Sequence, residues 1–220
     1  WLRDASLVLE SLKSVGHFRE ARGFIGFLLN IFESKQSKVQ ILYRVDGSTD
    51  LDEKTLPHLH GYRGSAPVRI GNNACRTRQN DIFGEVLNAI HLYYHHYEFE
   101  RMPREVWSLV KFLVNTVVRD WGNRDAGIWE FRHGPRHFTH SKMLSWVALD
   151  RGIQIAKRIG RDAVASEWAP LADTIREDIL HRGWKSSVGS FTQTYGRSTA
   201  LDVSLLQATR LGFLDPADTR

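Results

Sequence analysis

The stretch from Asp125 to Arg132, DAGIWEFR, combines residue types that are suited to proton transfer. Glu130 directly follows Trp129, and Gly127 lets the backbone turn just before them. An indole face removes water from a neighbouring carboxyl and raises its pKa, so the acid keeps its proton near neutral pH. Such an acid can donate that proton to a leaving oxygen, for example the oxygen of a glycosidic bond. The alternative is an ordinary loop with a surface glutamate.

Polar residues at the start of two other segments are candidate ligand-binding groups. Arg3 and Asp4 are adjacent, and such a pair can bind neighbouring hydroxyls because one side chain donates and the other accepts. The alternative is a salt bridge at the start of a helix. Gln79 and Asp81 precede a helical apolar pattern, and Arg69 stands in a turn before them. Asp81 can equally serve as the cap of that helix.

The histidines and the cysteine do not form a recognisable metal or nucleophile motif. His91 and His95 have helical spacing but lack the glutamate of an HExxH motif, and His137 and His140 lack accompanying cysteine or acidic ligands. Neither a GxSxG elbow nor a phosphate-binding GxxxxGK loop is present. We therefore expect no metal and no other cofactor. Of the catalytic groups that the sequence contains, a pair of carboxylic acids is the best candidate.

Composition describes a soluble globular protein of 220 residues with 42% hydrophobic residues and a net charge of +5. Lys and Arg are scattered among acids rather than gathered in a basic tract, so we expect no nucleic-acid partner. No apolar run reaches the ~20 residues of a membrane helix, so no membrane partner is expected. The single cysteine, Cys75, fits a reducing compartment and a cytoplasmic location. Both ends look cut, which suggests a segment of a longer protein.

Periodicity of apolar residues predicts an all-α chain of seven helices. The expected helices cover residues 4–14, 18–32, 81–99, 104–119, 139–159, a stretch that begins at 162, and 200–211. Thr139 is a plausible cap for the fifth helix. The three long connections are residues 37–80, 120–138 and 183–199, and the first of them contains a strand-like piece, Val39–Tyr43.

The long connections precede the third, fifth and seventh helices, whereas the connections after the first, third and fifth are short. Antiparallel neighbours then place the starts of all odd-numbered helices at one end of the bundle. Residues 1–4, 69–81, 125–140 and 195–202 are therefore expected to converge on one face. Four polar, aromatic-bearing segments on one face predict a binding or catalytic site.

Five ordered segments of the chain resemble glycoside hydrolase family 15, the glucoamylase and trehalase group. Residues 1–5, WLRDA, resemble its W-x-R-D-A/S motif, and residues 58–72 resemble its long-loop signature. Residues 79–85 resemble Q-L-D-x-Y-G-E, with departures at Asn80 and Phe83. Residues 125–142 resemble the segment that bears the general acid, and residues 191–206 resemble the repeat that follows.

The resemblance implies an (α/α)6 barrel catalytic domain, present over residues 1–220 as an incomplete segment of about seven helices. It implies Glu130 as the general acid. Arg3 and Asp4 are implied to bind hydroxyls of the non-reducing-end glucose, with Trp1 and Trp129 as the walls of that subsite. Further substrate-binding residues implied by the resemblance are Arg69, Gln79, Asp81 and Arg132.

The chain departs from the family in ending before the region that bears the general base, a glutamate. The N-terminal β-sandwich domain and the C-terminal barrel helices of related members are also absent. We expect an inverting, exo-acting α-glucoside hydrolase of glucoamylase or trehalase type, whose isolated 220 residues lack activity. The substrate is an α-linked glucose oligosaccharide or trehalose; the choice between them, phosphate dependence and oligomeric state stay open. The alternative is a carbohydrate-binding or scaffold toroid without turnover.

Overall fold

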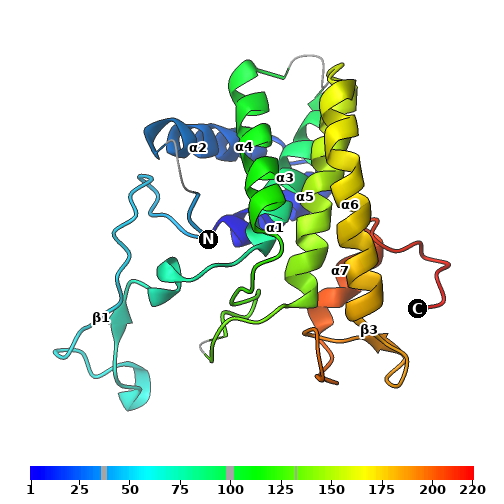
Figure 1. The fold of residues 1–220 in the computed structure, drawn as a ribbon. Helices are drawn as coiled ribbons and strands as arrows, with labels where there is room; N and C mark the ends of the chain where they lie inside the picture. Colours follow the sequence, from blue (N-terminus) through cyan, green and yellow to red (C-terminus); the bar gives the residue numbers. More distant parts are fainter. Residues whose placement is uncertain (36–38, 98–101, 132) are drawn as a thin grey trace.

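Helices dominate the computed structural model, which describes residues 1–35, 39–97, 102–131 and 133–220 (Figure 1). The α-helices are α1 (Leu2–Ser14), α2 (Arg19–Lys35), α3 (Asp81–Tyr97), α4 (Arg104–Asp120), α5 (Thr139–Arg158), α6 (Asp162–Arg182) and α7 (Gln207–Arg210). The 3-10 helices among these described residues are η1 (Tyr62–Gly64), η2 (Asn73–Arg76) and η4 (Val203–Leu206). The all-α class predicted from the periodicity is confirmed. Within the described residues, no helix combines the length and apolar character that crossing a membrane requires.

The described strands form two antiparallel pairs of two residues each. The paired strands are β1 (Lys54–Thr55) with β2 (Arg69–Ile70), and β3 (Trp184–Lys185) with β4 (Ser190–Phe191). In the first pair Lys54 lies opposite Ile70, and in the second Trp184 lies opposite Phe191. Pairs this short cannot form a layer of the fold. The helices therefore build the core.

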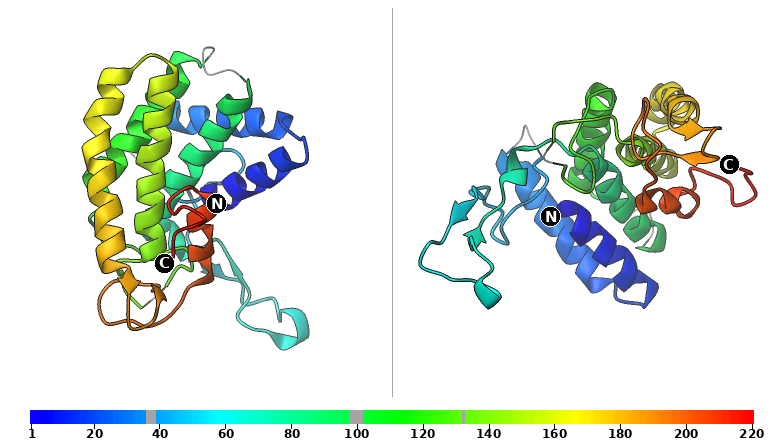
Figure 2. Two further views of the ribbon diagram at one scale, coloured as in Figure 1. Left: turned by 90° about the vertical axis from the view of Figure 1, so that its right-hand side faces the viewer. Right: turned by 90° about the horizontal axis from the view of Figure 1, so that it is seen from below.

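Helix α5 is the centre of the fold, because it packs against α3, α4 and α6. Figures 1 and 2 show α3 to α6 standing side by side, with the hairpin of α1 and α2 lying across them. Helix α1 rests on α3, which joins the hairpin to the core. Leu87 and Ile90 of α3 and Leu144 and Val147 of α5 are completely buried in one apolar cluster. Burial of each such side chain stabilises the fold by about 1.5–3 kcal/mol.

Gly84 lets α3 and α5 approach each other closely near their first turns. A Cβ atom at this position would lie 2.2 Å from the backbone oxygen of Leu144, which no larger residue can accommodate without moving a helix. The close approach draws together the polar starts of the two helices, at Asp81 and His140. Packing in the core thus positions the polar groups described below.

A long excursion between α2 and α3, residues 44–76, is called the β1–β2 arm here. Figures 1 and 2 show it projecting away from the helices. It contains β1, η1, β2 and η2, and most of its residues are exposed. Ala74, close to the end of the arm, is buried and anchors it to the core.

Three local predictions are wrong. Residues 39–43 form no strand: the carbonyl of Ile41 instead accepts a hydrogen bond from Leu2 N at the start of α1 (3.0 Å). Thr139 is the first residue of α5 rather than its cap, and its hydroxyl donates to the carbonyl of Thr192 (2.5 Å). The last helix does not begin at residue 200, because Asp202 is extended and caps the short η4 that precedes α7.

Candidate active site

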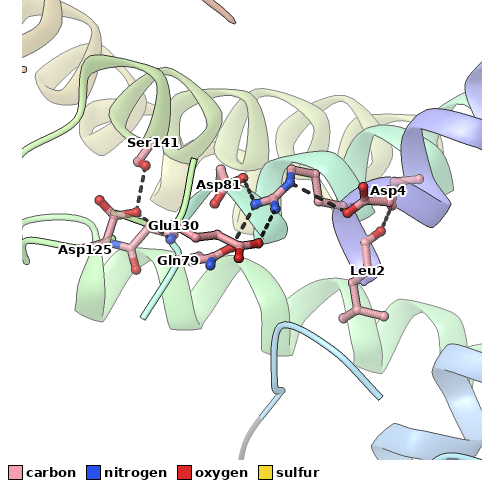
Figure 3. Close-up of polar contacts among 10 residues, drawn as sticks. Leu2, Asp4, Gln79, Asp81, Asp125, Glu130 and Ser141 are labelled. Carbon is pink, nitrogen blue, oxygen red and sulfur yellow. Dashed lines mark hydrogen bonds and ion pairs between the residues drawn. The ribbon is translucent and has the colours of Figure 1, made fainter. Parts of the chain in front are cut away.

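The guanidinium of Arg3 joins three segments that are far apart in the sequence. Figure 3 shows the side chains of Gln79, Asp81 and Glu130 lying close together. Arg3 Nη1 donates to Gln79 Oε1 (2.8 Å) and to Asp81 Oδ2 (2.9 Å), and Arg3 Nη2 donates to Glu130 Oε1 (3.3 Å). These four residues are called the Arg3 cluster here. Arg3 is only 6% exposed. Burial alone lowers the pKa of Arg3, but the Asp81 carboxylate outweighs it and raises the pKa, which keeps the guanidinium charged.

Three members of the Arg3 cluster stand at or just before the start of a helix. Arg3 lies in the first turn of α1, and Asp81 is the first residue of α3, with Gln79 just before it. Packing of α1 on α3 therefore determines how the guanidinium meets the carboxylate. Glu130 comes from the connection between α4 and α5. Such an arrangement matches the predicted convergence of helix starts.

Glu130 stands in a tight turn that aims its carboxyl at Arg3. The backbone N–H of Glu130 donates to the carbonyl of Gly127 (3.1 Å), and that of Phe131 donates to Ala126 (2.9 Å). Glu130 has a φ angle of 56°, the left-handed region that side-chain-bearing residues seldom adopt. Gly127 also has a positive φ, and a Cβ there would lie 2.8 Å from the ring of Phe138. The turn thus depends on glycine at one position and tolerates an unfavourable conformation at the other.

The carboxyl of Glu130 is partly shielded, with 29% of its side chain exposed. Burial raises its pKa above the ordinary value, and the nearby Arg3 opposes this without cancelling it. A carboxyl with a raised pKa keeps its proton to higher pH. Glu130 therefore has the electrostatic setting of a proton donor.

Asp125 fastens the turn that carries Glu130. Its Oδ2 accepts hydrogen bonds from the backbone N–H of Asn80 (2.9 Å) and from the hydroxyl of Ser141 (2.7 Å). Its backbone pairs in both directions with Arg136 (2.9 Å each). Burial raises the pKa of Asp125 to about 6, although the two hydrogen bonds lower it. Through these contacts the turn is tied to the starts of both α3 and α5.

Trp129 and Asp202 link the same turn to the segment before α7. The indole Nε1 of Trp129 donates to both carboxylate oxygens of Asp202, at 2.9 and 3.1 Å. The Trp129 residue is still 52% exposed, so its ring faces the outside while its polar edge is bound. Asp202 also accepts from Gln193 Nε2 (3.1 Å).

Several buried polar atoms of α3, of Gln79 just before it and of the first turn of α5 lack a partner within the part of the chain that the structure describes. Asp81 Oδ1, Gln79 Nε2, Glu85 Oε1 and both ring nitrogens of His140 have no hydrogen-bond partner among the described residues. Burial lowers the pKa of His140, so its ring is neutral, and burial raises the pKa of Glu85 to about 8. Glu85 follows Asp81 by four residues on α3, so both lie on one face of that helix.

The remaining predicted residues lie in different places. Trp1 packs beside the cluster, with the Arg3 guanidinium 5.6 Å from its ring centre. Asp4 lies at the rim, with 64% of its side chain exposed and its Oδ2 3.9 Å from Arg3 Nε. Arg69 is not brought to the cluster: it lies on β2 of the arm and pairs with Glu53 (3.4 Å). Arg132 lies outside the described residues.

Four residues of the site, Asp125, Asp202, His140 and Glu85, were not predicted from their spacing alone. Asp125 and Asp202 act through hydrogen bonds across long sequence separations, which no local pattern reveals. His140 appears in the sequence only as one of several histidines in a loop. Glu85 did carry a local indication, because a carboxyl four residues after Asp81 on an apolar helix must be buried or paired. Among the described residues, no group of three or more His, Cys, Asp or Glu side chains is arranged to hold a metal ion.

The helical fold is that of a segment of an all-α toroid. Solved structures support this class. A glycosidase in complex with glucose matches with a TM-score of 0.73 over 100% of this chain and 57% of its own, at 16% identity. A glucoamylase from Saccharomycopsis fibuligera matches with a TM-score of 0.64 over 95% of this chain and 44% of its own, also at 16% identity.

The family follows from the sequence comparison: the model of glycosyl hydrolases family 15 matches residues 1–220, and the chain belongs to that family. The trehalase of Mycobacterium tuberculosis is 41% identical over 223 residues and covers 100% of this chain. The trehalase of Thermoplasma volcanium is 34% identical over 227 residues, again over 100% of this chain. The chain spans 32% and 34% of the lengths of these two relatives, about a third of each.

Proposed function

We propose that this chain supplies the acid-bearing half of the active site of an inverting, exo-acting α-glucoside hydrolase. Glu130 is the general acid and protonates the leaving glycosidic oxygen. The observation that carries the proposal is the Arg3 cluster, in which a partly shielded carboxyl with a raised pKa lies 3.3 Å from a buried, charged guanidinium. Membership of the family and likeness to trehalases support hydrolysis of an α-glucoside.

Arg3 has a second role in this proposal, as a binder of sugar hydroxyls. A guanidinium carries five N–H donors. Gln79, Asp81 and Glu130 engage three of them among the described residues, which leaves one N–H of Nη2 and the Nε–H, the latter 3.9 Å from Asp4 Oδ2. Asp4, exposed at the rim, supplies an acceptor beside them. Trp1 and Trp129 form apolar walls, and Arg69 is excluded from the proposed set by its position on the arm.

Inversion needs a second carboxylate roughly 6.5–9.5 Å from the first, so that a water molecule fits between it and the sugar. Neither Asp125 nor Asp202 suits this role: Asp125 is buried beneath the turn, and both oxygens of Asp202 already accept hydrogen bonds. We therefore infer that the base, together with further barrel helices, comes from sequence outside these 220 residues. The lengths of the trehalase relatives support this inference.

Trehalose is the favoured substrate, because the trehalases named above match the whole chain at 34–41% identity. The alternative substrate is an α-linked glucose oligosaccharide. A side-by-side assay of the complete protein with trehalose and maltose, with and without phosphate, distinguishes these and tests for phosphorolysis. The anomer of the first glucose released, followed by NMR, tests inversion.

The variant Glu130→Gln tests the assigned acid. It keeps the size and hydrogen-bonding capacity of the side chain but has no proton of suitable acidity, so hydrolysis should fall by about 10²–10⁴-fold. Binding of trehalose, measured by calorimetry, should persist. The exposed Glu105→Gln on α4 is the matched control and should behave as the wild type. Full activity in Glu130→Gln refutes the assignment. If the wild-type protein itself binds trehalose but hydrolyses none, a carbohydrate-binding toroid is favoured.

A further inference from the structure

The carboxylate of Asp202 accepts hydrogen bonds from donors in three segments of the chain. Its Oδ1 accepts from the backbone N–H of Ser204 (2.9 Å) and from the Ser204 hydroxyl (2.7 Å). Its Oδ2 accepts from Gln193 Nε2 (3.1 Å) and from the indole of Trp129 (2.9 Å). The indole N–H also lies 3.1 Å from Oδ1, so Trp129 binds both oxygens, whereas Ser204 binds only Oδ1 and Gln193 binds only Oδ2.

The bond to Trp129 spans a long stretch of chain and reaches the residue next to Glu130. An indole has a single N–H donor, so once Asp202 binds it the ring can no longer rotate freely. The half-exposed ring then presents only its apolar surface to a ligand, next to the proposed acid. That surface suits the C–H face of a sugar ring better than a rotating ring does, because no side-chain order is lost on binding.

The charge of Asp202 strengthens this bond. Burial raises its pKa, but the hydrogen bonds from Ser204, Trp129 and Gln193 prevail and lower it. A hydrogen bond to an ionised acceptor is roughly twice as strong as one between neutral groups. Burial lowers the pKa of the His140 ring, and the Asp202 carboxylate acts against this larger effect to raise it.

We propose that Asp202 is a positioning residue, which holds the Trp129 ring as a fixed wall for the sugar unit beside Glu130. The role in catalysis rests on the proposed function, whereas the hydrogen bond itself does not. Because Trp129 and Glu130 are adjacent, a rotated ring also disturbs the left-handed turn that aims the acid. Asp202 acts through Trp129 and does not touch the reacting atoms.

The variant Asp202→Asn separates this role from capping. Asparagine is as good a helix cap as aspartate, so its carbonyl oxygen can keep the bonds to Ser204. Its amide nitrogen replaces Oδ2 and faces two other donors, from Trp129 and Gln193, so the indole loses its shorter bond (2.9 Å) and keeps only the 3.1 Å contact at the Oδ1 position. We expect kcat/KM for trehalose to fall about tenfold to a hundredfold, as small misplacements in active sites do.

Two measurements on the complete protein decide the proposal. The indole N–H resonance of Trp129, assigned by its disappearance in Trp129→Phe, should move upfield in Asp202→Asn. In the Trp129→Phe background, Asp202→Asn should lower kcat/KM for trehalose by less than a further twofold. An unmoved resonance, or an equal loss of kcat/KM in both backgrounds, overturns the proposal.

A matched control is Asp215→Asn, since Asp215 caps a turn in the same way, through Ala217 N (2.7 Å), away from the cluster. It should change neither the resonance nor the rate. If the wild type hydrolyses no α-glucoside, the proposed function fails, but the shift of the resonance still tests the hydrogen bond. The two failures are thereby distinguished.

Discussion

The Arg3 cluster and the β1–β2 arm both place an arginine beside a carboxylate, with opposite results. Arg3 is 6% exposed and meets a buried Asp81 at 2.9 Å. The side chain of Arg69 is 47% exposed and meets Glu53 at 3.4 Å. The first pair is held by helix starts that pack on a common core. The second lies at a pair of strands that are only two residues long each. The same residue types form a site only where rigid elements bring them out of water.

The largest expected effect is that of Arg3→Ala. It leaves the Asp81 carboxylate buried without its partner, which costs about 3–5 kcal/mol of unfolding free energy. Activity should fall with it, because both the orientation of Glu130 and the hydroxyl donors are lost. Urea unfolding and trehalose hydrolysis measure the two effects. Arg3→Lys keeps the charge but not the planar fork, so it should recover stability more than activity; equal recovery of both contradicts the proposed binding role.

A smaller effect on stability is expected at Asp125, where two variants should differ from each other. Asp125→Ala leaves the Asn80 N–H and the Ser141 hydroxyl unpaired, at about 1–3 kcal/mol. Asp125→Asn keeps both bonds, since both donors bind the same oxygen. It should be at least as stable as the wild type at pH 7. Equal destabilisation by both variants, measured by urea unfolding, means that the negative charge itself is required.

The pH dependence of Asp125 has a definite sign. Its folded pKa of about 6 exceeds the ordinary 3.8, so folding favours the protonated form. Its contribution to stability is therefore present below pH 3.8 and lost as the pH rises through 6. Asp125→Asn should flatten the fall in unfolding free energy over this interval, relative to the wild type. An unchanged slope contradicts the raised pKa.

The smallest effect is expected for Arg69→Ala. Its ion pair is exposed, and such pairs contribute about 0–1 kcal/mol. The free energy of unfolding should fall by no more than about 1 kcal/mol. The kcat/KM for trehalose should stay within twofold of the wild-type value. A large rise in KM would mean that Arg69 binds substrate, as the family resemblance implies. The arm would then contribute to the site as the Arg3 cluster does.

Much of the fold could be predicted, because burial leaves a periodic trace in the sequence. Helices α3 and α4 begin at Asp81 and Arg104, where the apolar periodicity begins. The conformations of residues 39–43 and of the last helix could not be predicted in the same way. Both depend on partners that are remote in sequence, such as Leu2 for Ile41 and Trp129 for Asp202.

The site was predictable to the extent that it depends on helix topology. Alternating long and short connections predict that Arg3, Asp81 and Glu130 converge, and the structure brings them into direct contact. Topology does not predict which residues fasten the converging loops. Asp125 and Asp202 do so by accepting hydrogen bonds over 45 and 73 positions of sequence. The catalytic and binding roles of these residues stay predictions.

The backbone of Glu130 has a consequence for any attempt to make this protein more robust. A φ of 56° at a residue other than glycine stores of order 1–3 kcal/mol of strain. Glycine adopts this conformation at little cost, so selection for folding alone favours replacing the one carboxyl that the proposed chemistry cannot spare. Thermal robustness and turnover are thus opposed at a single position, and a screen for heat resistance that ignores activity would find that substitution attractive.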